Sequence, residues 1–267
     1  MDVLEVASEI DLPDRAVWLL GDVHGNTRWI QRAFPAMKRS DPDVRTVLQL
    51  GDWWQDTRPV DHWAKIAGID RVLVTLGNHE PYGTLAPFLS ENPGLAVRIS
   101  RAVWILPRPF RFRVGGRSFL SLGGATSADI EWRTEDVDWW PDEAITDAEV
   151  RDAISFGPVD VLLTHESPDA TPVLEVRRVI EERSGASERG VAESTRSSRL
   201  MVDRLVEAIR PALHVHGHLH VSGVGVTSTR RVVSLGRDLD PGSIARLDLA
   251  SLKESFLQAD DVWHKRR

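Results

Sequence analysis

The chain has 267 residues, of which 42% are hydrophobic and 27% charged, as expected of one globular domain spanning residues 1–267. The formal net charge is −7 and no block of Lys or Arg stands out, so nucleic-acid binding is disfavoured, though not excluded. There is no cysteine, so disulfides and thiolate metal sites are excluded and oxygen and imidazole remain as metal ligands. Residues 1–13 lack the features of a signal peptide, and no apolar run approaches the roughly 20 residues of a membrane span, so a cytoplasmic protein is expected.

The first part of the chain alternates between apolar runs and amphipathic stretches. Buried strands are predicted at residues 16–20, 46–50 and 71–76. Asn26 can cap a helix over residues 27–38, which Pro35 would kink or shorten, and a second helix is expected around residues 60–67. Strands that are apolar throughout and alternate with helices are typical of a parallel sheet covered on both faces.

The middle of the chain has the pattern of antiparallel structure. Strands are predicted at residues 102–106, 110–114 and 118–122. Gly115-Gly116 is a hairpin signal between the last two of these strands. Gly123-Gly124 then begins a long loop over residues 125–142 that is rich in tryptophan.

The last part returns to alternating helices and strands. Thr146 caps a predicted helix that runs to about Phe156, and a buried strand is expected at residues 160–164. Residues 181–198 are polar and predict a mobile surface loop, followed by an amphipathic helix over residues 200–209. Further strands are predicted at residues 213–216, 222–227, 231–235 and 245–249. No internal repeat and no linker between domains is evident.

Five of the predicted strands are followed by Asp, Asn or His. These residues are Asp22 and His24, Asp52, Asn78, His165, and finally His218 and His220. Binding sites in open sheets are built where strands end, so we expect these side chains to converge. Our hypothesis is that Asp52 is a carboxylate shared by two metal ions and that the other strand ends supply the remaining ligands.

The chemistry of a two-metal site suits these residue types. Two cations ~3.5–4 Å apart need a bridging oxygen ligand, and a short aspartate provides two oxygens. His24 follows Asp22 by two positions, so a tight loop can direct both at one ion. His218 and His220 have the same spacing, and in an extended chain alternate residues share a face. Neighbouring glycines permit the tight turns that such a site requires. A metal pair lowers the pKa of a shared water, which yields hydroxide at neutral pH for in-line attack on phosphorus.

The complete set of motifs resembles a known family. The sequence contains Gly-Asp-Val-His-Gly-Asn from Gly21, Gly-Asp at 51–52, Gly-Asn-His-Glu at 77–80, His165, and Gly-His-Leu-His at 217–220. In this order, these motifs resemble the calcineurin-like metallophosphoesterase superfamily. The resemblance implies an α/β fold, a four-layer α/β/β/α sandwich with two mixed sheets and a dinuclear metal site at the strand ends.

The resemblance also implies individual roles. One metal would be held by Asp22, His24, Asp52 and His220. The other would be held by Asp52, Asn78, His165 and His218. His79 would bind no metal and would stabilise the transition state or protonate the leaving oxygen, a role that imidazole fits near neutral pH.

The sequence departs from the serine/threonine protein phosphatases of the superfamily. Those enzymes carry Asp-Arg-Gly shortly after the bridging aspartate, whereas here Asp56 is shifted by one place and the Arg-Gly is missing. They also have His-Gly-Gly where this chain has His165-Glu166-Ser167. The final Gly-His-Leu-His is more similar to the bacterial and phage phosphodiesterases, so protein-phosphatase activity is disfavoured.

Residues beside the motifs are further candidates. A nucleobase could stack on one of five tryptophans, although packing in the core is the favoured alternative: Trp53, Trp54, Trp132, Trp139 and Trp140. Candidates for phosphate contact are Arg58, Arg108 and Arg133. Tyr82 and Glu166 flank candidate ligands and could support them. His214 and His216 fit ordinary strand positions better than a supporting role, and His62 and His264 fit the surface.

The expected protein is therefore a phosphoester hydrolase with two divalent cations. Manganese is favoured, with iron, zinc, nickel or magnesium as alternatives. The favoured substrate is a phosphodiester, either a nucleotide, which includes cyclic nucleotides, or another small diester. The alternatives are a phosphomonoesterase or protein phosphatase, a nuclease, and an inactive protein of the same fold. The sequence leaves the oligomeric state open.

Overall fold

The computed structural model describes residues 3–54, 56–186, 189–258 and 261–262. His264, expected at the surface, lies outside these residues. Within them, the strands form two mixed sheets. One sheet has the order β1 (Glu5–Ala7), β6 (Ala96–Arg98), β7 (Val103–Ile105), β5 (Arg71–Val74), β4 (Thr46–Gln49), β3 (Ala16–Leu20), β14 (Ile244–Asp248) and β15 (Lys253–Phe256). The other has the order β12 (Gly223–Val226), β13 (Arg231–Ser234), β11 (Leu213–His216), β10 (Val161–Thr164), β9 (Arg117–Leu122), β8 (Phe110–Val114) and β2 (Asp11–Leu12).

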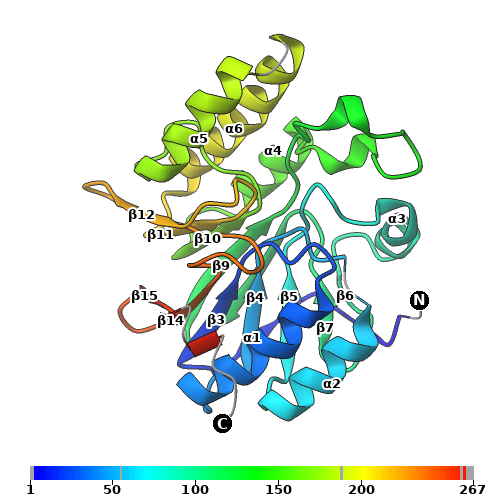
Figure 1. Cartoon of the computed structure of the whole chain (residues 1–267), viewed down its shortest axis with the longest axis vertical. Coiled ribbons are helices and arrows are strands. Elements are labelled where there is room, and N and C mark those ends of the chain that lie inside the picture. The colour runs from blue at the N-terminus through cyan, green and yellow to red at the C-terminus, as the bar shows by residue number, and fades with distance from the viewer. Residues whose placement is uncertain (1–2, 55, 187–188, 259–260, 263–267) are drawn as a thin grey trace.

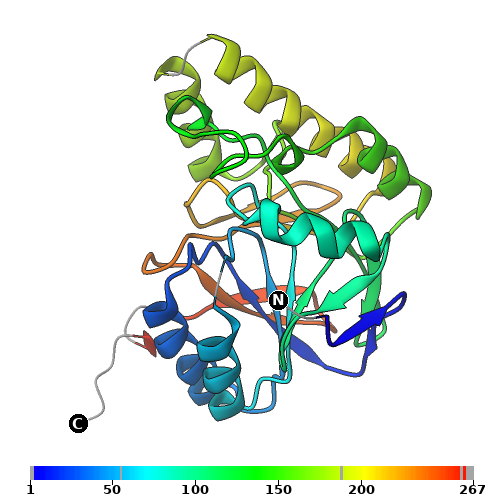
Figure 2. The ribbon, with the colours of Figure 1, turned by 90° about the vertical axis from the view of Figure 1, so that its right-hand side faces the viewer.

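Helices cover the outer faces of the two sheets, as Figure 1 and the perpendicular view in Figure 2 show. The helices are α1 (Thr27–Ser40), α2 (Thr57–Ala67), α3 (Tyr82–Glu91), α4 (Asp147–Ser155), α5 (Leu174–Ala186) and α6 (Arg189–Ile209). Two short 3₁₀ helices lie between β9 and α4, at Ile130–Trp132 and Pro141–Glu143. The order of layers is helix, sheet, sheet, helix, which confirms the predicted four-layer sandwich.

Strand β3 illustrates why its sequence is apolar throughout. Val17 and Leu19 belong to the core between the two sheets, whereas Trp18 and Leu20 belong to the core beneath α1 and α2. Alternate side chains point to opposite faces of a strand, so a strand with a covered face on each side needs apolar residues at every position. The predicted parallel arrangement of the first three strands is confirmed, since β3 pairs with β4 and β4 with β5 in parallel.

Most predicted elements are present, with small differences at their ends. The side chain of Asn26 accepts a hydrogen bond from Trp29 N at 3.1 Å and begins α1, as predicted. Pro35 does not shorten this helix, which continues to Ser40. The hairpin at Gly115-Gly116 is confirmed by the antiparallel pairing of β8 with β9.

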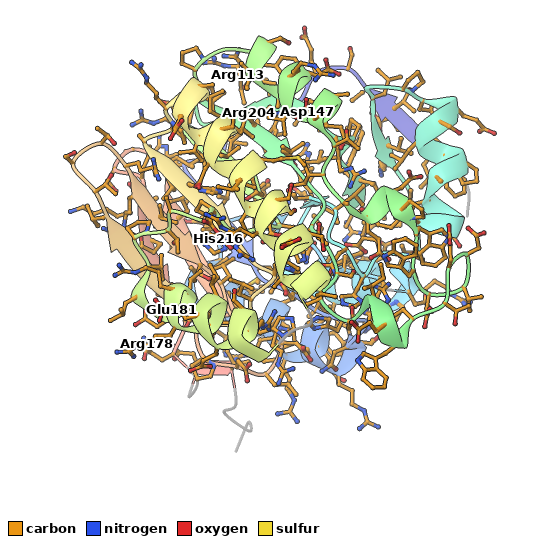
Figure 3. The ribbon with its side chains drawn as sticks, turned by 90° about the horizontal axis from the view of Figure 1, so that it is seen from above. Arg113, Asp147, Arg178, Glu181, Arg204 and His216 are labelled. Atoms are coloured by element: carbon orange, nitrogen blue, oxygen red, sulfur yellow. The ribbon has the colours of Figure 1, made fainter. Side chains whose placement is uncertain are left out.

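The prediction of a mobile loop over residues 181–198 is wrong. The described part of this segment belongs to α5 and α6. Its polar composition reflects helices with most of their surface in water, because only one side packs on the protein. Toward its C-terminal end, α6 buries Val202, Leu205 and Val206 against α4 and the second sheet, and Arg204 of α6 pairs with Asp147 of α4 at 2.7 Å (Figure 3).

Other elements were not predicted. Helix α3 has Pro81 at its N-cap position and Pro87 inside, and it buries only Tyr82 and Leu85, so its sequence lacks a clear helical pattern. The short strands β1, β2, β6 and β15 owe their conformation to their pairing partners. None of the helices in the described ranges has the length and apolar character needed to cross a membrane.

His214 and His216 are buried positions of β11, as favoured from the sequence. Thr164 Oγ1 donates its only hydrogen to Glu166 O at 2.6 Å, so it must accept from His214 Nε2, which lies 2.8 Å away. His214 Nδ1 has no hydrogen-bond partner among the described residues. Burial therefore holds the pKa of His214 well below its ordinary value, with the neighbouring His216 and Arg230 acting in the same direction.

This burial predicts a pH-dependent stability. The unfolded chain protonates His214 near its ordinary pKa of 6.5, whereas the folded chain does not. Stability is therefore lost as pH falls below that value, by about 1.4 kcal/mol per pH unit for this group. Urea unfolding at pH 7 and pH 5 should show a smaller loss for His214→Gln than for the unaltered chain. His62→Gln, at an exposed histidine of α2, is the matched control and should leave the loss unchanged. Equal losses in the two variants would contradict the assignment.

Candidate metal centre

The predicted site residues follow strands whose carboxyl ends meet at one rim. Strands β3, β4 and β5 run parallel in the first sheet, and β10 and β11 run parallel in the second. Each is followed by one of the loops that carry the seven predicted ligands: Asp22, His24, Asp52, Asn78, His165, His218 and His220. The loops contact one another directly, since His24 N donates to Asp52 O at 2.8 Å and His218 N to Asp22 Oδ2 at 3.2 Å.

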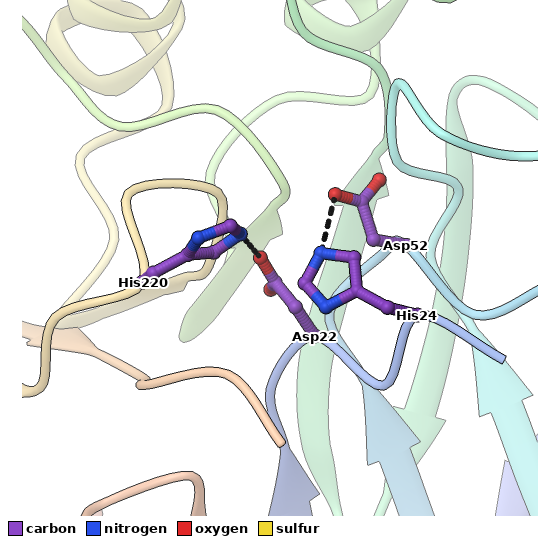
Figure 4. A group of neighbouring side chains, drawn as sticks. All are labelled: Asp22, His24, Asp52 and His220. Atoms are coloured by element: carbon purple, nitrogen blue, oxygen red, sulfur yellow. Dashed lines mark ion pairs between the residues drawn. The ribbon is translucent and has the colours of Figure 1, made fainter. Parts of the chain in front are cut away.

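Four of these side chains form one cluster, shown in Figure 4. Each of Asp22, His24, Asp52 and His220 offers a ligand atom, and these atoms all lie within 4.8 Å of one another. His24 Nε2 is 3.5 Å from Asp52 Oδ2, and His220 Nε2 is 3.2 Å from Asp22 Oδ2. This cluster has the size and composition to hold a cation.

A second group of side chains meets the other oxygen of Asp52. His165 Nε2 lies 3.3 Å from Asp52 Oδ1 and 3.0 Å from Asn78 Oδ1. His165 Nδ1 is 2.6 Å from Leu50 O, a carbonyl that can only accept, so Nδ1 carries a hydrogen. The ring of His218 is 5.0 Å from that of His165. Nε2 of His165 thus faces two oxygen acceptors, an arrangement that is stable only with positive charge between them.

The electrostatics of the rim identify where that positive charge belongs. Burial alone would raise the pKa of Asp52, but His165 and His24 hold it well below its ordinary value. Burial would lower the pKa of His165, but Asp52 raises it to about 10. Burial would likewise lower the pKa of His24, but Asp238 and Asp52 raise it to about 9. Bound protons therefore balance Asp52, and divalent cations would replace those protons on binding.

The donor set fits divalent cations. Two carboxylates, four imidazoles and one amide oxygen come together at a rim without thiolates, which suits borderline and hard metals. Asp52 is 1% exposed, and its Oδ2 accepts no hydrogen bond from any described residue. A buried carboxylate oxygen without a donor is stabilised by a cation.

Four of the seven candidate ligands have backbone conformations in the left-handed region. His24, Asp52, His218 and His220 have φ values of 49°, 53°, 68° and 60°, which non-glycine residues rarely adopt. Such conformations cluster at functional sites, where the surroundings enforce them. Gly51, with φ of 99°, is required for a second reason, since a Cβ there would lie 2.2 Å from His165 Nδ1.

Sequence reasoning missed Asp238, which orients His24. Asp238 lies in the loop after β13, its Oδ1 is 3.2 Å from His24 Nδ1, and its Oδ2 accepts from Asn26 Nδ2 at 2.6 Å. A carboxylate on one ring nitrogen fixes the tautomer and leaves Nε2 directed at Asp52. The sequence signal, a lone aspartate 214 residues after His24, could not have identified it.

Asn78 is oriented by a chain of polar contacts. Asn78 Nδ2 donates to Ser127 Oγ at 2.9 Å, which directs Asn78 Oδ1 toward His165. Ser127 Oγ donates to Glu143 Oε2 at 2.5 Å, and Arg133 pairs with Glu143 at 2.7 Å. Arg133, predicted as a phosphate contact, thus has its charge matched by Glu143 and supports the loop that carries Ser127. Neither Ser127 nor Glu143 was predicted.

The other two predicted arginines lie away from the rim pocket, whereas Tyr82 and Glu166 lie close to candidate ligands. Arg58 is 92% exposed beside Asp56. Arg108 is partly buried and pairs with Glu149 at 3.0 Å, and neither arginine lines the rim pocket. Tyr82 donates to Gly77 O at 2.8 Å and thereby supports the loop of Asn78. Burial raises the pKa of Glu166 to about 7, and its Oε1 lies 4.0 Å from His218 Nε2.

His79 stands between two pockets. Its backbone N donates to Asp52 Oδ1 at 2.8 Å, and its Nε2 lies 3.7 Å from Asp129 Oδ2. The first pocket, which we call the rim pocket, has a volume of about 360 Å³ and is lined by Asp52, Asn78, His79, Ala128, Asp129, Trp132, Arg183, His218 and His220. The second, the aromatic pocket, has a volume of about 410 Å³ and is lined by Trp54, His79, Glu80, Pro81, Asp129, Arg133, Val137, Asp138 and Trp140.

The five predicted tryptophans divide between core and pockets. Trp53 is buried, whereas Trp54 is 42% exposed in the aromatic pocket together with Trp140. Trp132 is 85% exposed on the rim pocket. Trp139 is partly exposed and lines neither pocket.

Comparison with known proteins identifies the family. A family model described as calcineurin-like phosphoesterase matches residues 16–222. The chain belongs to this family. The match includes all seven predicted ligands and His79, and the calcineurin-like resemblance expected from the motifs is confirmed. No curated protein matches the chain.

Solved structures share the calcineurin-like fold at low sequence identity. A dimetal phosphatase from Danio rerio has a TM-score of 0.56 and 13% identity, covering 92% of this chain and 99% of its own. TT1561 of Thermus thermophilus has a TM-score of 0.51 and 12% identity, covering 92% and 99%. A putative 5′-nucleotidase from Staphylococcus aureus has a TM-score of 0.50 and 15% identity, covering 91% of this chain but 52% of its own. At these identities the likeness concerns the fold.

The contact between Asp238 and His24 leads to a prediction. Asp238→Ala should weaken binding of the cation at His24 by about 10- to 100-fold, because the ring loses the group that fixes its tautomer and orientation. Calorimetric titration with Mn²⁺ measures this change. Asp240→Ala is the control, since Asp240 lies in the same loop but pairs with Arg237 at 3.2 Å. Equal Mn²⁺ affinity in the two variants would show that Asp238 does not position the ligand.

Proposed function

We propose that the chain is a metal-dependent phosphodiesterase that acts on a nucleotide or a similar small diester. The observation that carries this proposal is the position of His79. Its backbone N–H donates a hydrogen bond to Asp52, and its side chain lines both the rim pocket and the aromatic pocket. A substrate phosphate in the rim pocket would therefore have its ester oxygen beside an imidazole.

The proposed metal ligands fall into two sets that share Asp52. One set is Asp22, His24, Asp52 and His220, and the other is Asp52, Asn78, His165 and His218. Manganese suits the mixture of oxygen and imidazole donors. When bound, the two cations supply Lewis acidity and lower the pKa of a water that they share.

His79 is the proposed catalytic residue. Hydrolysis adds water across the P–O ester bond, so the departing oxygen must gain a proton as that bond breaks. An imidazole at the edge of the rim pocket can donate this hydrogen, and Asp129, 3.7 Å from Nε2, orients the ring. Burial lowers the pKa of His79 below its ordinary value, although the charges of Asp52 and Asp129 oppose this shift.

The aromatic pocket favours a nucleotide among the possible diesters. Trp54 presents an exposed indole ring 5.9 Å from the ring of His79. Stacking of a base on an aromatic side chain contributes about 1–3 kcal/mol and depends little on which base is present. The missing Arg-Gly after Asp56 disfavours a protein phosphatase.

The role of His79 can be tested with simple esters. The Mn²⁺-loaded protein should hydrolyse bis-p-nitrophenyl phosphate faster than p-nitrophenyl phosphate, and His79→Asn should lower kcat for the diester by about 10²- to 10⁴-fold. Metal content, measured by elemental analysis, should be unchanged in this variant. A faster monoester reaction would favour the phosphomonoesterase. No hydrolysis of either ester with both metals bound would favour an inactive member of the family.

The role of Trp54 can be tested with nucleotides. Trp54→Leu should raise KM for a cyclic or dinucleotide substrate by about 5- to 100-fold because the base loses its stacking partner. KM for a non-aromatic diester such as dimethyl phosphate should remain unchanged. Trp139→Leu, at a partly exposed tryptophan outside both pockets, is the control. Equal KM values for nucleotides in the two variants would remove the aromatic pocket from substrate binding.

A further inference from the structure

Arg183 lies on the same face of helix α5 as the apolar residues that pack against the protein. Val176, Val179, Ile180 and Arg183 follow one another at spacings of three, one and three residues, which places them on one face of a helix. The three apolar residues belong to a small core cluster that includes Leu219, the residue between His218 and His220. The packing that holds α5 against this loop therefore also directs Arg183 toward the rim.

Arg183 reaches the rim pocket. It lines this pocket together with Asp52, His79 and His218, although it is 131 residues from Asp52 in the sequence. The same side chain also lines a small cavity beside Leu219 and Ile180, which continues the packing of α5. Of the residues that line the rim pocket, Arg183 is the one arginine or lysine in the described part of the chain.

Arg183 differs from the nearby arginines in having no hydrogen-bond or ion-pair partner among the described residues. Arg199 of α6 pairs with Asp169 at 3.0 Å, and Arg133 pairs with Glu143 at 2.7 Å. Arg183 is half-buried, yet it makes no hydrogen bond or ion pair with any residue that the structure describes. Burial lowers its pKa, and only the more distant charges of Glu166, Asp22 and Asp129 oppose this effect. Half-buried guanidinium groups without partners are uncommon, because their desolvation is not compensated.

We infer that Arg183 binds the phosphoryl oxygens of the substrate, an inference that rests on the proposed function. The planar guanidinium offers several N–H donors whose geometry matches a phosphate, and it keeps its charge at every physiological pH. An oxyanion in the rim pocket supplies the partner that the described residues do not provide. Helix α5 is thus a substrate-recognition element of the site.

The charges of the rim pocket also orient the substrate. Asp129, from the loop after β9, lines the same pocket and lies beside His79. A carboxylate repels phosphoryl oxygens and Arg183 attracts them, so the anionic oxygens turn toward α5. The ester oxygen that leaves then faces His79 and Asp129, and the organic group enters the aromatic pocket. The substrate class is a phosphoester with free anionic oxygens on the phosphorus that is attacked.

The test compares two arginines of the same helix. Arg178 is exposed at the outer side of α5, where Figure 3 shows it beside Glu181, and it lines no described pocket near the rim. Arg183→Gln and Arg178→Gln remove the same charge from α5. Inorganic phosphate, titrated calorimetrically into the Mn²⁺-loaded proteins, probes anion binding without turnover. KM and kcat for bis-p-nitrophenyl phosphate probe the substrate.

Arg183→Gln should weaken phosphate binding by about 10- to 100-fold, as expected for loss of a charge-assisted hydrogen bond, and raise KM by a similar factor. Arg183→Lys should recover part of the affinity because it restores the charge but not the fork of donors. Arg178→Gln should change either quantity by less than about twofold, as expected for an exposed charge. Thermal unfolding checks that each variant is folded. If Arg183→Gln is not folded, the phosphate affinity and KM of Arg183→Lys are compared with those of Arg178→Gln instead.

Equal phosphate affinity and KM in Arg183→Gln and Arg178→Gln would overturn the role of Arg183 and leave phosphoester hydrolysis standing. Loss of phosphate binding in Arg183→Gln, in a protein that hydrolyses no phosphoester, would support Arg183 as an anion-binding residue and overturn the proposed function.

Discussion

The structure of the rim depends on a carboxylate that is held away from water. Asp52 is almost fully buried, and an isolated charge in such a place costs several kcal/mol unless it is compensated. The carboxylate charge is compensated from three separate loops: Oδ1 accepts a hydrogen bond from His79 N and faces the ring of His165, and Oδ2 faces the ring of His24. Removing the positive charge from this place would leave the loops organised around an uncompensated anion, so cation binding and the local fold are linked.

The two sheets make this convergence possible. Parallel strands deliver their following loops to the same edge, and the apolar core between the sheets holds the edges of both sheets together. The left-handed backbone at His24, Asp52, His218 and His220 then turns side chains into the rim that an extended chain would direct elsewhere. The layers surrounding this rim provide the remaining parts: the loop before α4 supports Asn78 through Ser127, and α5 brings Arg183 to the rim pocket.

Much of this arrangement could be predicted from the sequence, for definite physical reasons. Strands β3, β4, β5, β10 and β11 are covered on both faces, and each is followed by a polar residue that marks the rim. The sequences of β3, β5 and β10 are mainly apolar, whereas β4 and β11 also bury polar residues such as Gln49 and His214. Arg183 could not be found in this way, because the polar segment around it has the composition of a loop. Only the packing of Val179 and Ile180 on Leu219 shows which face of α5 is directed inward. Asp238 and Ser127 act through contacts with residues far away in the sequence, and no local pattern marks such residues. The left-handed backbone of the ligands themselves was equally invisible, since the sequence indicated strain only at the glycines.

The proposed metal centre holds two cations, one on either side of Asp52. Anomalous diffraction at the manganese absorption edge, from crystals grown with Mn²⁺, tests this most directly. Two peaks about 3.5–4 Å apart are expected, one beside His24 and His220 and the other beside Asn78 and His165, with Asp52 between them. A single peak, or peaks remote from Asp52, would contradict it.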